Sequence, residues 1–323
     1  MKIFKPELFQ GNLSSENYFE GWYFKHVSRN LDNVYSFIPG VSLNPRNPHA
    51  FIQVINGVSG STQYIEYPLS AFRHDKRILK IQIGESEFTR DKIVLDIHAP
   101  EIKISGQLVY SAAIRYPASF FSPGIMGWYS FIPFMECKHA VVSVSHRIDG
   151  SLLVNNRLVS FSGGKGYVEK DWGRSFPESW IWLHSNNFQH SDACVMMSIA
   201  KIPWLGSFFP GLIAFLYVDG RFYCFCTYNK SEIVQLDYDG QILQIVLRNQ
   251  RNELVLKATL NKSGILLAPV SGKMERHIKE SIDSEVEVAL TDLHGNEIYH
   301  DTAARTGLEV IEGIFNVVKM KGK

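Results

Sequence analysis

Apolar and polar residues alternate along much of this 323-residue chain, and this period of two limits its fold more than any other feature. The alternation is clearest in three segments, RILKIQI (77–83), LVLKATL (254–260) and EVEVAL (285–290). In the first segment Leu79, Ile81 and Ile83 fall on one side. This spacing places every second side chain in a core, which is typical of half-buried antiparallel strands.

Turn signals separate the strand-like runs. Asp149-Gly150, Asp219-Gly220 and Asp239-Gly240 each lie between two such runs, and Asp-Gly favours the tight turn of a β-hairpin. Met274, Ile278 and Ile282 indicate one short amphipathic helix. We therefore predict an all-β protein with few short helices, whose antiparallel strands close into barrels or sandwiches.

Two aromatic segments indicate a repeated organisation. If FEGWYFKH (19–26) is extended, Glu20, Trp22, Phe24 and His26 share one face. If ESWIWLHSNNF (178–188) is extended, one face carries Trp180, Trp182, His184, Asn186 and Phe188. Each segment would begin a new set of strands. We predict two similar β domains, residues 1–172 and 173–323, that meet near residues 160–180.

Composition excludes several classes of protein. Hydrophobic residues make up 45% and charged residues 20%, which is ordinary for a chain with a core. The net charge is +1, so nucleic acid is not an expected partner. The four cysteines, Cys137, Cys194, Cys224 and Cys226, fit no zinc or disulfide spacing. The start, MKIFKPELFQG, has no apolar signal core, and we expect a cytoplasmic protein with reduced cysteines.

Two segments without charge approach the length of a membrane span, Tyr116–Met135 and Ile202–Val218. Both contain several prolines and glycines, which would break a lipid-exposed helix. We interpret them as apolar loops or short helices that run into strands. They are expected to form an apolar mouth that touches lipid peripherally without spanning it; the alternative is ordinary core.

The densest group of polar and aromatic residues is 163–188. In an extended GYVEKDW, Tyr167, Glu169 and Asp171 share one face, while Lys170 and Trp172 lie opposite. Two neighbouring buried carboxyls raise the pKa of one of them, so that it can act as an acid. The alternative is a surface strand with solvated charges.

A second candidate acid is Glu20, between Phe19 and Trp22. The alternative for Glu20 is a structural carboxylate that caps backbone amides. His26, His184 and Asn186 could line a pocket, or the histidines could be satisfied core residues. The sequence has no HxH or HExxH spacing, no GxSxG and no phosphate-binding loop, so neither a metal nor another cofactor is predicted.

Three segments resemble the tocopherol cyclase-like family, in particular its bacterial branch: FEGWYF (19–24), GWYSFIPFMEC (127–137) and YVEKDWGRSFPESWIWLHSNNF (167–188). More remotely, the pattern is similar to carotenoid 1,2-hydratases. The resemblance implies two lipocalin-like β-barrels and the cyclisation of a prenylated benzoquinol, or a related isoprenoid, to a chromanol. Protonation of an alkene and capture by the phenol oxygen require no cofactor.

The resemblance also implies roles for individual residues. The available acids are Glu20, Glu169 and Asp171, and the aromatic faces for the cation are Trp22, Tyr23, Trp172, Trp180 and Trp182. His184 and Asn186 would orient the quinol hydroxyls. We favour Asp171 as the acid, because it lies against Trp172 at the end of its strand, and Arg174 could hold the other carboxylate charged. Plant cyclases have Asn at position 171, which favours Glu169 or Glu20 instead.

Two other functions fit parts of the sequence. A non-catalytic lipocalin-like carrier or sensor of a hydrophobic isoprenoid would need the same cavity without a buried acid. A carbohydrate-active β protein would use aromatic platforms and two carboxylates, but the uncharged segments argue against an open polar groove.

Overall fold

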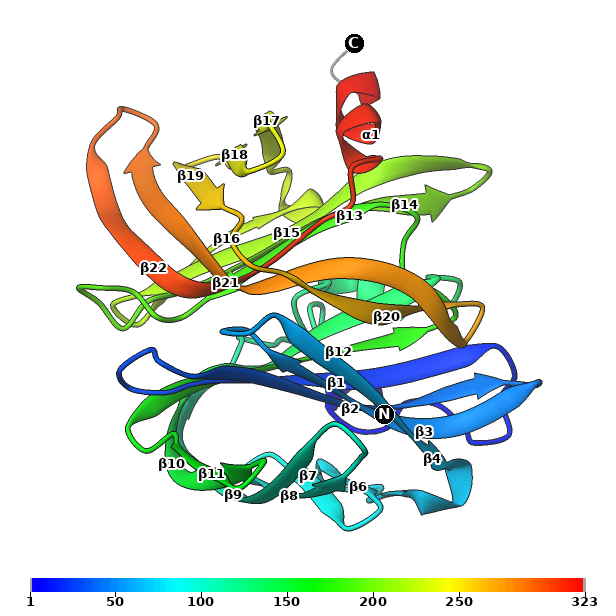
Figure 1. The fold of residues 1–323 in the computed structure, drawn as a ribbon. Coiled ribbons are helices and arrows are strands. Elements are labelled where there is room, and N and C mark those ends of the chain that lie inside the picture. Colours follow the sequence, from blue (N-terminus) through cyan, green and yellow to red (C-terminus); the bar gives the residue numbers. More distant parts are fainter. Residues whose placement is uncertain (1, 322–323) are drawn as a thin grey trace. The chain divides into compact units, whose positions relative to one another are not determined.

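The computed structural model describes residues 2–321, and antiparallel strands dominate it, as predicted. Within this range the helical elements are one α-helix, α1 (Ile314–Lys321), and four short 3₁₀ helices. The 3₁₀ helices are η1 (Lys2–Phe4), η2 (Leu69–Ala71), η3 (Gly127–Phe131) and η4 (Thr227–Asn229). The strands form two large sheets (Figure 1).

Backbone contacts divide the chain into two compact units. The first contains the chain up to Phe176 together with Ile265–His277, and the second contains Pro177–Gly264 together with the chain from Ile278 onward. Whether residues 1–172 and 173–323 are separate folding domains stays a prediction.

The first unit contains a 12-stranded sheet in the order β4-β3-β2-β1-β12-β10-β9-β8-β7-β6-β5, with β11 paired to β10. Its strands are β1 (Tyr18–Val27), β2 (Val34–Asn44), β3 (Asn47–Asn56), β4 (Ser61–Pro68), β5 (Phe72–His74), β6 (Lys80–Ile83), β7 (Ser86–Thr89), β8 (Lys92–His98), β9 (Lys103–Ile114), β10 (Cys137–Val154), β11 (Arg157–Ser160) and β12 (Gly164–Gly173).

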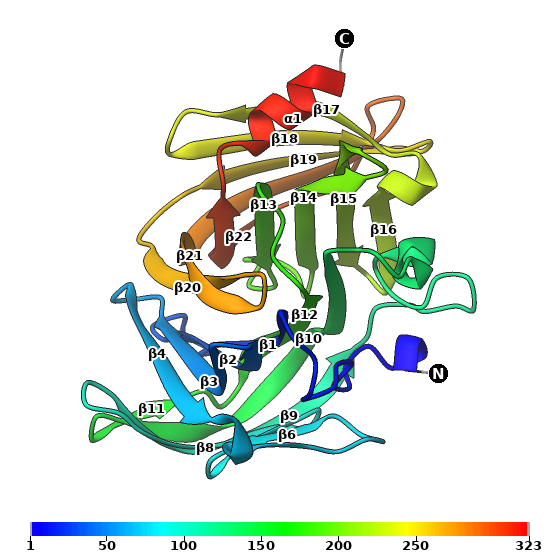
Figure 2. The ribbon, with the colours of Figure 1, turned by 90° about the vertical axis from the view of Figure 1, so that its right-hand side faces the viewer.

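This sheet curls back on itself around its core, as Figures 1 and 2 show. Trp22 and Phe24 of β1 enter the core together with Val168 of β12 and Leu108 of β9. Leu79, Ile81 and Ile83 also share one buried face, as the alternation predicts. Each large apolar side chain buried in this way contributes about 1.5–3 kcal/mol, so the period-two pattern drives the curling of the sheet.

The second large sheet has ten strands in the order β16-β15-β14-β13-β22-β21-β19-β18-β17, with β20 paired to β21. Most of it belongs to the second unit, whereas residues 265–277 of β20 and β21 are assigned to the first. The strands of this sheet are β13 (Trp180–Ser185), β14 (Cys194–Trp204), β15 (Ser207–Val218), β16 (Arg221–Cys226), β17 (Glu232–Tyr238), β18 (Ile242–Arg248), β19 (Asn252–Thr259), β20 (Gly264–Val270), β21 (Lys273–Asp292) and β22 (Glu297–Val310).

The core of the second unit confirms the alternation in the other two segments. Leu254 and Leu256 of β19 pack with Val286 and Val288 of β21. The C-terminal helix α1 adds Ile314 to the same core. The all-β, lipocalin-like fold class predicted from the sequence is therefore confirmed.

One of the three predicted hairpins is wrong. Asp219-Gly220 joins β15 to β16 and Asp239-Gly240 lies between β17 and β18, but Asp149-Gly150 lies inside the continuous strand β10. The turn instead falls at Asn155 and Asn156, both with positive φ. Gly150 is needed for a close approach within the sheet, because a Cβ there would lie 2.3 Å from the Gln107 carbonyl oxygen.

The predicted amphipathic helix at Met274, Ile278 and Ile282 is also wrong, because all three residues lie in strand β21. A spacing of four residues fits a period of two as well as a helical turn. Pairing with β22 decides between the two structures, and Ile278 and Ile282 are buried on the strand.

The two uncharged segments take different structures. Residues 116–135 form a loop that contains η3, and residues 202–218 lie in the hairpin of β14 and β15. Across residues 2–321 no helix has both the length and the apolar character needed to cross a bilayer. The four cysteines of the described chain are free thiols.

Residues 265–277 are fixed to the first unit by hydrogen bonds. The buried side chain of Gln53 donates to the Leu267 carbonyl oxygen (3.0 Å) and accepts from the Leu267 amide (2.9 Å). Ser42 Oγ donates to the carbonyl oxygen of Gly272 at 2.7 Å. These contacts pair buried polar groups that would otherwise be left unsatisfied.

A buried polar network lies among the aromatic residues of the first unit. His26 Nε2 is 2.6 Å from the hydroxyl of Tyr110, whose ring lies 4.1 Å from the ring of His146. Ser143 Oγ is 2.9 Å from His146 Nδ1. Burial lowers the pKa of His146 to about 3 and that of His26 well below its usual value, so both imidazoles are neutral at neutral pH.

These two histidines predict a loss of stability in acid. Below about pH 6.5 the unfolded chain binds a proton at each histidine that the folded chain does not bind, so folding weakens as the pH falls toward about 3. The slope is about 1.4 kcal/mol per pH unit for each group. The free energy of unfolding of His146→Asn, measured by urea titration between these limits, should depend less steeply on pH by about that amount. His277→Asn, at an exposed position, should keep the wild-type slope, and equal slopes in all three proteins would contradict this explanation.

Candidate active site

Strand β12 contributes charged residues to both faces of the sheet of the first unit. It lies between β1 and β10, and Glu169 pairs with Tyr23 on one side and Val141 on the other. Since directly opposed residues point to the same face of a sheet, Tyr167, Glu169 and Asp171 lie on the face opposite the core. Lys170 and Trp172 lie on the core face, as the sequence pattern predicts.

The outer face carries a cluster of one histidine and two carboxylates, of which Glu169 is buried and the other two are part-buried. His139 of β10 is the direct partner of Asp171, and its Nδ1 lies 3.0 Å from Asp171 Oδ1. Its Nε2 lies 3.6 Å from Glu169 Oε2, which also accepts a 2.7 Å hydrogen bond from the Tyr167 hydroxyl. We call His139, Glu169 and Asp171 the acid cluster.

The imidazole of His139 is the protonated group of the acid cluster. Burial would lower the pKa of His139, but Asp171 and then Glu169 outweigh burial and raise that pKa to about 9. At neutral pH the cluster therefore holds an imidazolium between two carboxyls. The side chain of Glu169 is only 6% exposed, whereas that of Asp171 is 25% exposed.

Other groups frame the cluster. The thiol of Cys137 lies 3.8 Å from Asp171 Oδ1, and burial, with a further contribution from Asp171, raises its pKa well above the usual value. The backbone N–H of His139 points at the sulfur of Met126, 3.1 Å away, so the uncharged loop packs directly on the cluster. Lys25, directly across from Tyr167, is also buried on this face.

The acid cluster has a donor set that could also hold a divalent cation. One ligand atom from each of its three residues lies within 4.8 Å of the others. Nitrogen and carboxylate ligands of this kind suit zinc, manganese or iron. Residues 139, 169 and 171 come from two strands, so a search for short motifs cannot detect the combination. The prediction that the protein uses no metal stays a prediction.

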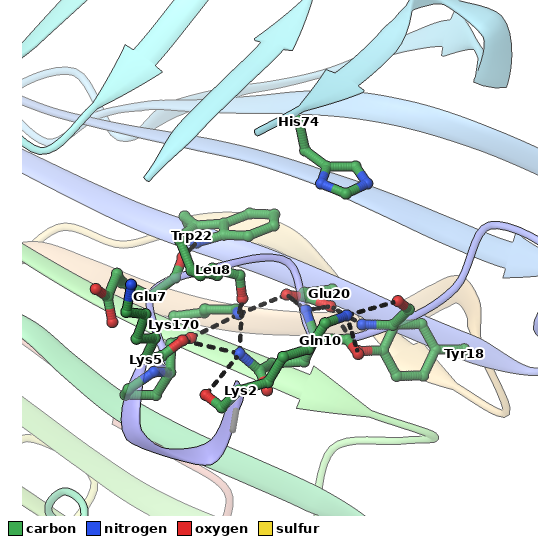
Figure 3. Close-up of polar contacts among 12 residues, drawn as sticks. Lys2, Lys5, Glu7, Leu8, Gln10, Tyr18, Glu20, Trp22, His74 and Lys170 are labelled. Carbon is green, nitrogen blue, oxygen red and sulfur yellow. Dashed lines mark hydrogen bonds and ion pairs between the residues drawn. The ribbon is translucent and has the colours of Figure 1, made fainter. Parts of the chain in front are cut away.

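The core face carries a second charged group, the buried ion pair of Glu20 and Lys170 (Figure 3). Their Nζ and Oε1 atoms are 2.5 Å apart, and both side chains are fully buried. Glu20 also accepts hydrogen bonds from the backbone amides of Gln10 and Gly11 and from the hydroxyl of Tyr18. Its contacts match the structural alternative for this residue, a carboxylate that caps amides.

Lys170 lies between two predicted substrate-binding rings. Its Nζ is 4.7 Å from the ring centroids of both Trp22 and Trp172, and it donates to the carbonyl oxygens of Pro6 (2.7 Å) and Leu8 (2.5 Å). Burial lowers the pKa of Lys170 to about 8, although Glu20 opposes this effect. The two indoles therefore surround an ammonium group of the protein itself.

The structure separates the three predicted acids. Glu169 and Asp171 lie together in the acid cluster, whereas Glu20 lies on the other face of the sheet. Tyr23 lies on the face of the cluster, directly across from Glu169. Arg174, expected to hold one carboxylate charged, is exposed, and His139 lies beside Asp171 instead.

The other predicted binding residues belong to the second unit. Trp180, Trp182 and His184 alternate along β13 and are buried, while Ile181 and Leu183 between them enter the core. The indole N–H of Trp180 donates to Glu309, His184 Nε2 lies 3.6 Å from Cys194 Sγ, and Asn186 accepts from Asn187 (3.0 Å). Phe188 was expected on the same face but packs in the core, because β13 ends at Ser185.

Sequence reasoning missed His139, because its significance depends on strand pairing. No local motif surrounds it, and 32 residues separate it from Asp171. The signal that could have found it is the alignment of β10 against β12, which needs the register and not the sequence alone.

The curled antiparallel sheets define a lipocalin-like β protein, and the acid cluster gathers three titratable groups on one face of its first sheet. The family model described as Tocopherol cyclase-like matches residues 109–312, which include the acid cluster. The chain therefore belongs to the tocopherol cyclase-like family.

Individual relatives are distant. The chloroplastic tocopherol cyclase of Zea mays is 26% identical over 120 residues, and the probable tocopherol cyclase of Oryza sativa subsp. japonica is 30% identical over 105 residues. These matches cover 37% and 31% of this chain but only 22% of each plant protein. A crystal structure of CghA with Sch210972 has a TM-score of 0.58 and 12% identity, covering 91% of this chain and 88% of that one, and shows similarity of fold.

The buried ion pair predicts a large cost for removing one partner. Lys170→Met would leave Glu20 buried without its cation, which costs about 3–5 kcal/mol in comparable pairs. We expect this loss in the free energy of unfolding measured by urea titration. Lys80→Met, which breaks a pair with Glu87 that is far more exposed, should cost about 0–1 kcal/mol.

The double variant Glu20→Gln/Lys170→Met provides the matching test. With both charges removed, the loss should be smaller than that of Lys170→Met alone, because no unpaired buried charge remains. A double variant less stable than the single one would show that the ion pair is not the source of the effect.

Proposed function

We propose that this protein is an enzyme that cyclises a prenylated benzoquinol, or a related isoprenoid, to a chromanol by acid catalysis. Family membership and the distant plant relatives support the reaction class. The observation that carries the proposal is the acid cluster, in which a protonated histidine lies between two neighbouring carboxyls, 3.0 Å from Asp171 and 3.6 Å from the buried Glu169.

Glu169 is the proposed proton donor. It is the more buried carboxyl, and burial favours its neutral form. Asp171 lies closer to the imidazolium, with 3.0 Å between its Oδ1 and His139 Nδ1, and is the hydrogen-bond partner of that ring. Two carboxyls held in different environments in this way divide into an acid and a charged partner. This assignment replaces Asp171 as the favoured donor and is compatible with the plant Asn at position 171.

The proposed reaction is an isomerisation, so the substrate and the product contain the same atoms. The proton of Glu169 adds to the less substituted carbon of the alkene, and the tertiary cation forms on the adjacent carbon. The phenol oxygen of the same molecule bonds to that cation and loses its proton, which returns to the acid cluster. His139 is a positioning residue, because it binds Asp171 and keeps a proton beside Glu169.

The second candidate is a non-catalytic carrier or sensor of a hydrophobic ligand. The lipocalin-like fold favours it, since such barrels hold small ligands. In the first unit, however, the interior of the sheet is packed with aromatic and aliphatic side chains, and the acid cluster lies on the other face. Native mass spectrometry that finds a prenylated ligand retained without conversion would support the carrier.

Removing the proposed donor should abolish turnover. Glu169→Gln keeps the shape of the side chain but removes the acid, and general acids contribute about 10²–10⁴-fold to rates. We expect a loss of this size in chromanol formation from a prenylated benzoquinol, followed by chromatography, with ligand binding retained. Asp171→Asn should retain more activity than Glu169→Gln.

The matched control is Glu85→Gln, which changes an exposed carboxyl of the same unit and should keep wild-type turnover. In deuterated water each product molecule should gain one deuterium at the carbon next to the new ether carbon. Wild-type rates in Glu169→Gln, or product without deuterium, would contradict the proposal.

The raised pKa of His139 predicts the alkaline limit of the reaction. The imidazolium persists up to about pH 9, so the rate should fall as the pH rises through that value and the cluster loses its stored proton. His139→Gln cannot titrate and should lose this limb of the pH–rate profile. A wild-type rate that is unchanged between pH 8 and pH 10 would exclude this role.

A further inference from the structure

Six exposed aromatic residues gather on the first unit, and we propose that they dock the protein on a lipid bilayer. We call them the aromatic surface: Phe4, Phe120, Phe121, Trp128, Phe131 and Phe134. This inference deepens the proposed function and rests on it, because a substrate with a prenyl tail resides in the bilayer.

The exposure of these side chains carries the proposal. Phe121 is 79% exposed, Phe120 69% and Phe134 59%, whereas most phenylalanines of this unit lie in its core. Phe4 stacks on Phe120 with ring centroids 5.9 Å apart and meets Phe131 edge-on at 6.4 Å. Phe4 thus joins Phe120 and Phe131 across the sequence, Trp128 and Phe134 extend from the same loop, and exposed apolar side chains gathered in this way mark an interaction surface.

The charges around the patch favour a bilayer over a second protein. Residues 116–135 carry no charge, Arg115 precedes them, and the exposed Lys2 and Lys5 lie on either side of Phe4 in the sequence. Glu136, which follows the segment, is part-buried and faces the charge of Arg174. Glu7, the first carboxylate of the chain, is paired with Arg90 at 2.6 Å. Aromatic side chains with a basic rim are typical of surfaces that enter the headgroup region of anionic membranes.

The aromatic surface is continuous with the acid cluster. The loop that carries Phe120 and Phe134 also carries Met126, whose sulfur lies 3.1 Å from the backbone nitrogen of His139. Strand β10 begins at Cys137, three residues after Phe134, and places His139 in the cluster. A bilayer held by this loop would therefore supply a tailed substrate beside the proposed acid.

The experiment measures co-sedimentation with vesicles of phosphatidylcholine, with and without phosphatidylglycerol. Wild-type protein should pellet with both, and more strongly with the anionic vesicles. Phe120→Ser/Phe121→Ser should weaken partitioning at least tenfold, since about 0.8 kcal/mol is lost for each buried CH₂. Lys2→Gln/Lys5→Gln should reduce only the phosphatidylglycerol-dependent part, roughly fivefold for each charge.

The matched control removes exposed apolar side chains elsewhere in the same unit. Ile78→Ser/Leu158→Ser changes residues that are 60% and 71% exposed, and it should bind vesicles like the wild type. Wild-type protein that pellets with neither vesicle, or a Phe120/Phe121 variant that pellets normally, would overturn the proposal. Analytical sedimentation could instead show a wild-type dimer that becomes monomeric in the Phe120/Phe121 variant. That result would assign the aromatic surface to contact with a second copy of the chain and would also overturn the proposal.

Turnover separates this inference from the proposed function. The Phe120→Ser/Phe121→Ser variant should cyclise a water-soluble, short-tailed quinol at the wild-type rate but lose activity on a long-tailed quinol carried in vesicles. Glu169→Gln should bind vesicles normally and cyclise neither substrate. Vesicle binding by a wild-type protein that cyclises neither substrate would support docking and contradict the enzyme.

Discussion

The pairing of β12 between β1 and β10 is the constraint on which the chemistry of the first unit depends. Because side chains alternate along β12, this register sends Lys170 into the core side and Glu169 and Asp171 to the opposite side. A shift of the register by one residue would exchange the two faces and separate the charges of β12 from their partners on β1 and β10. The apolar neighbours Trp22 and Val168 make such a shift costly, so the core fixes the positions of the charges.

Two charged groups thus lie on opposite sides of one sheet and serve different purposes. Glu20 and Lys170 satisfy each other, and the backbone of residues 6–11 and the hydroxyl of Tyr18 supply their further hydrogen bonds. In the acid cluster the raised pKa of His139 keeps a proton on the imidazole, between two carboxyls. An ion pair of this buried kind holds the fold together, whereas a cluster of titratable groups with a perturbed pKa is suited to catalysis.

Sequence reasoning predicted those features that depend on neighbours along one strand. The faces of β1 and β12, the opposite orientation of Lys170 and the pairing of Glu169 with Asp171 all follow from alternation. Features that depend on pairing between strands were not predictable: His139 beside Asp171, Lys170 between Trp22 and Trp172, and the continuation of β10 through Gly150. The error at Met274–Ile282 has the same origin, since a four-residue spacing suits a helix and a strand equally.

The hydrogen bonds of Gln53 and Ser42 to residues 267 and 272 limit where the chain can be divided into folding pieces. The first unit is completed by a segment encoded almost a hundred residues after its other strands end. A fragment that stops at residue 172 would lack this segment and expose the polar groups that it satisfies. No single cut of the chain therefore yields both units whole, because each unit is built from two separate stretches of sequence.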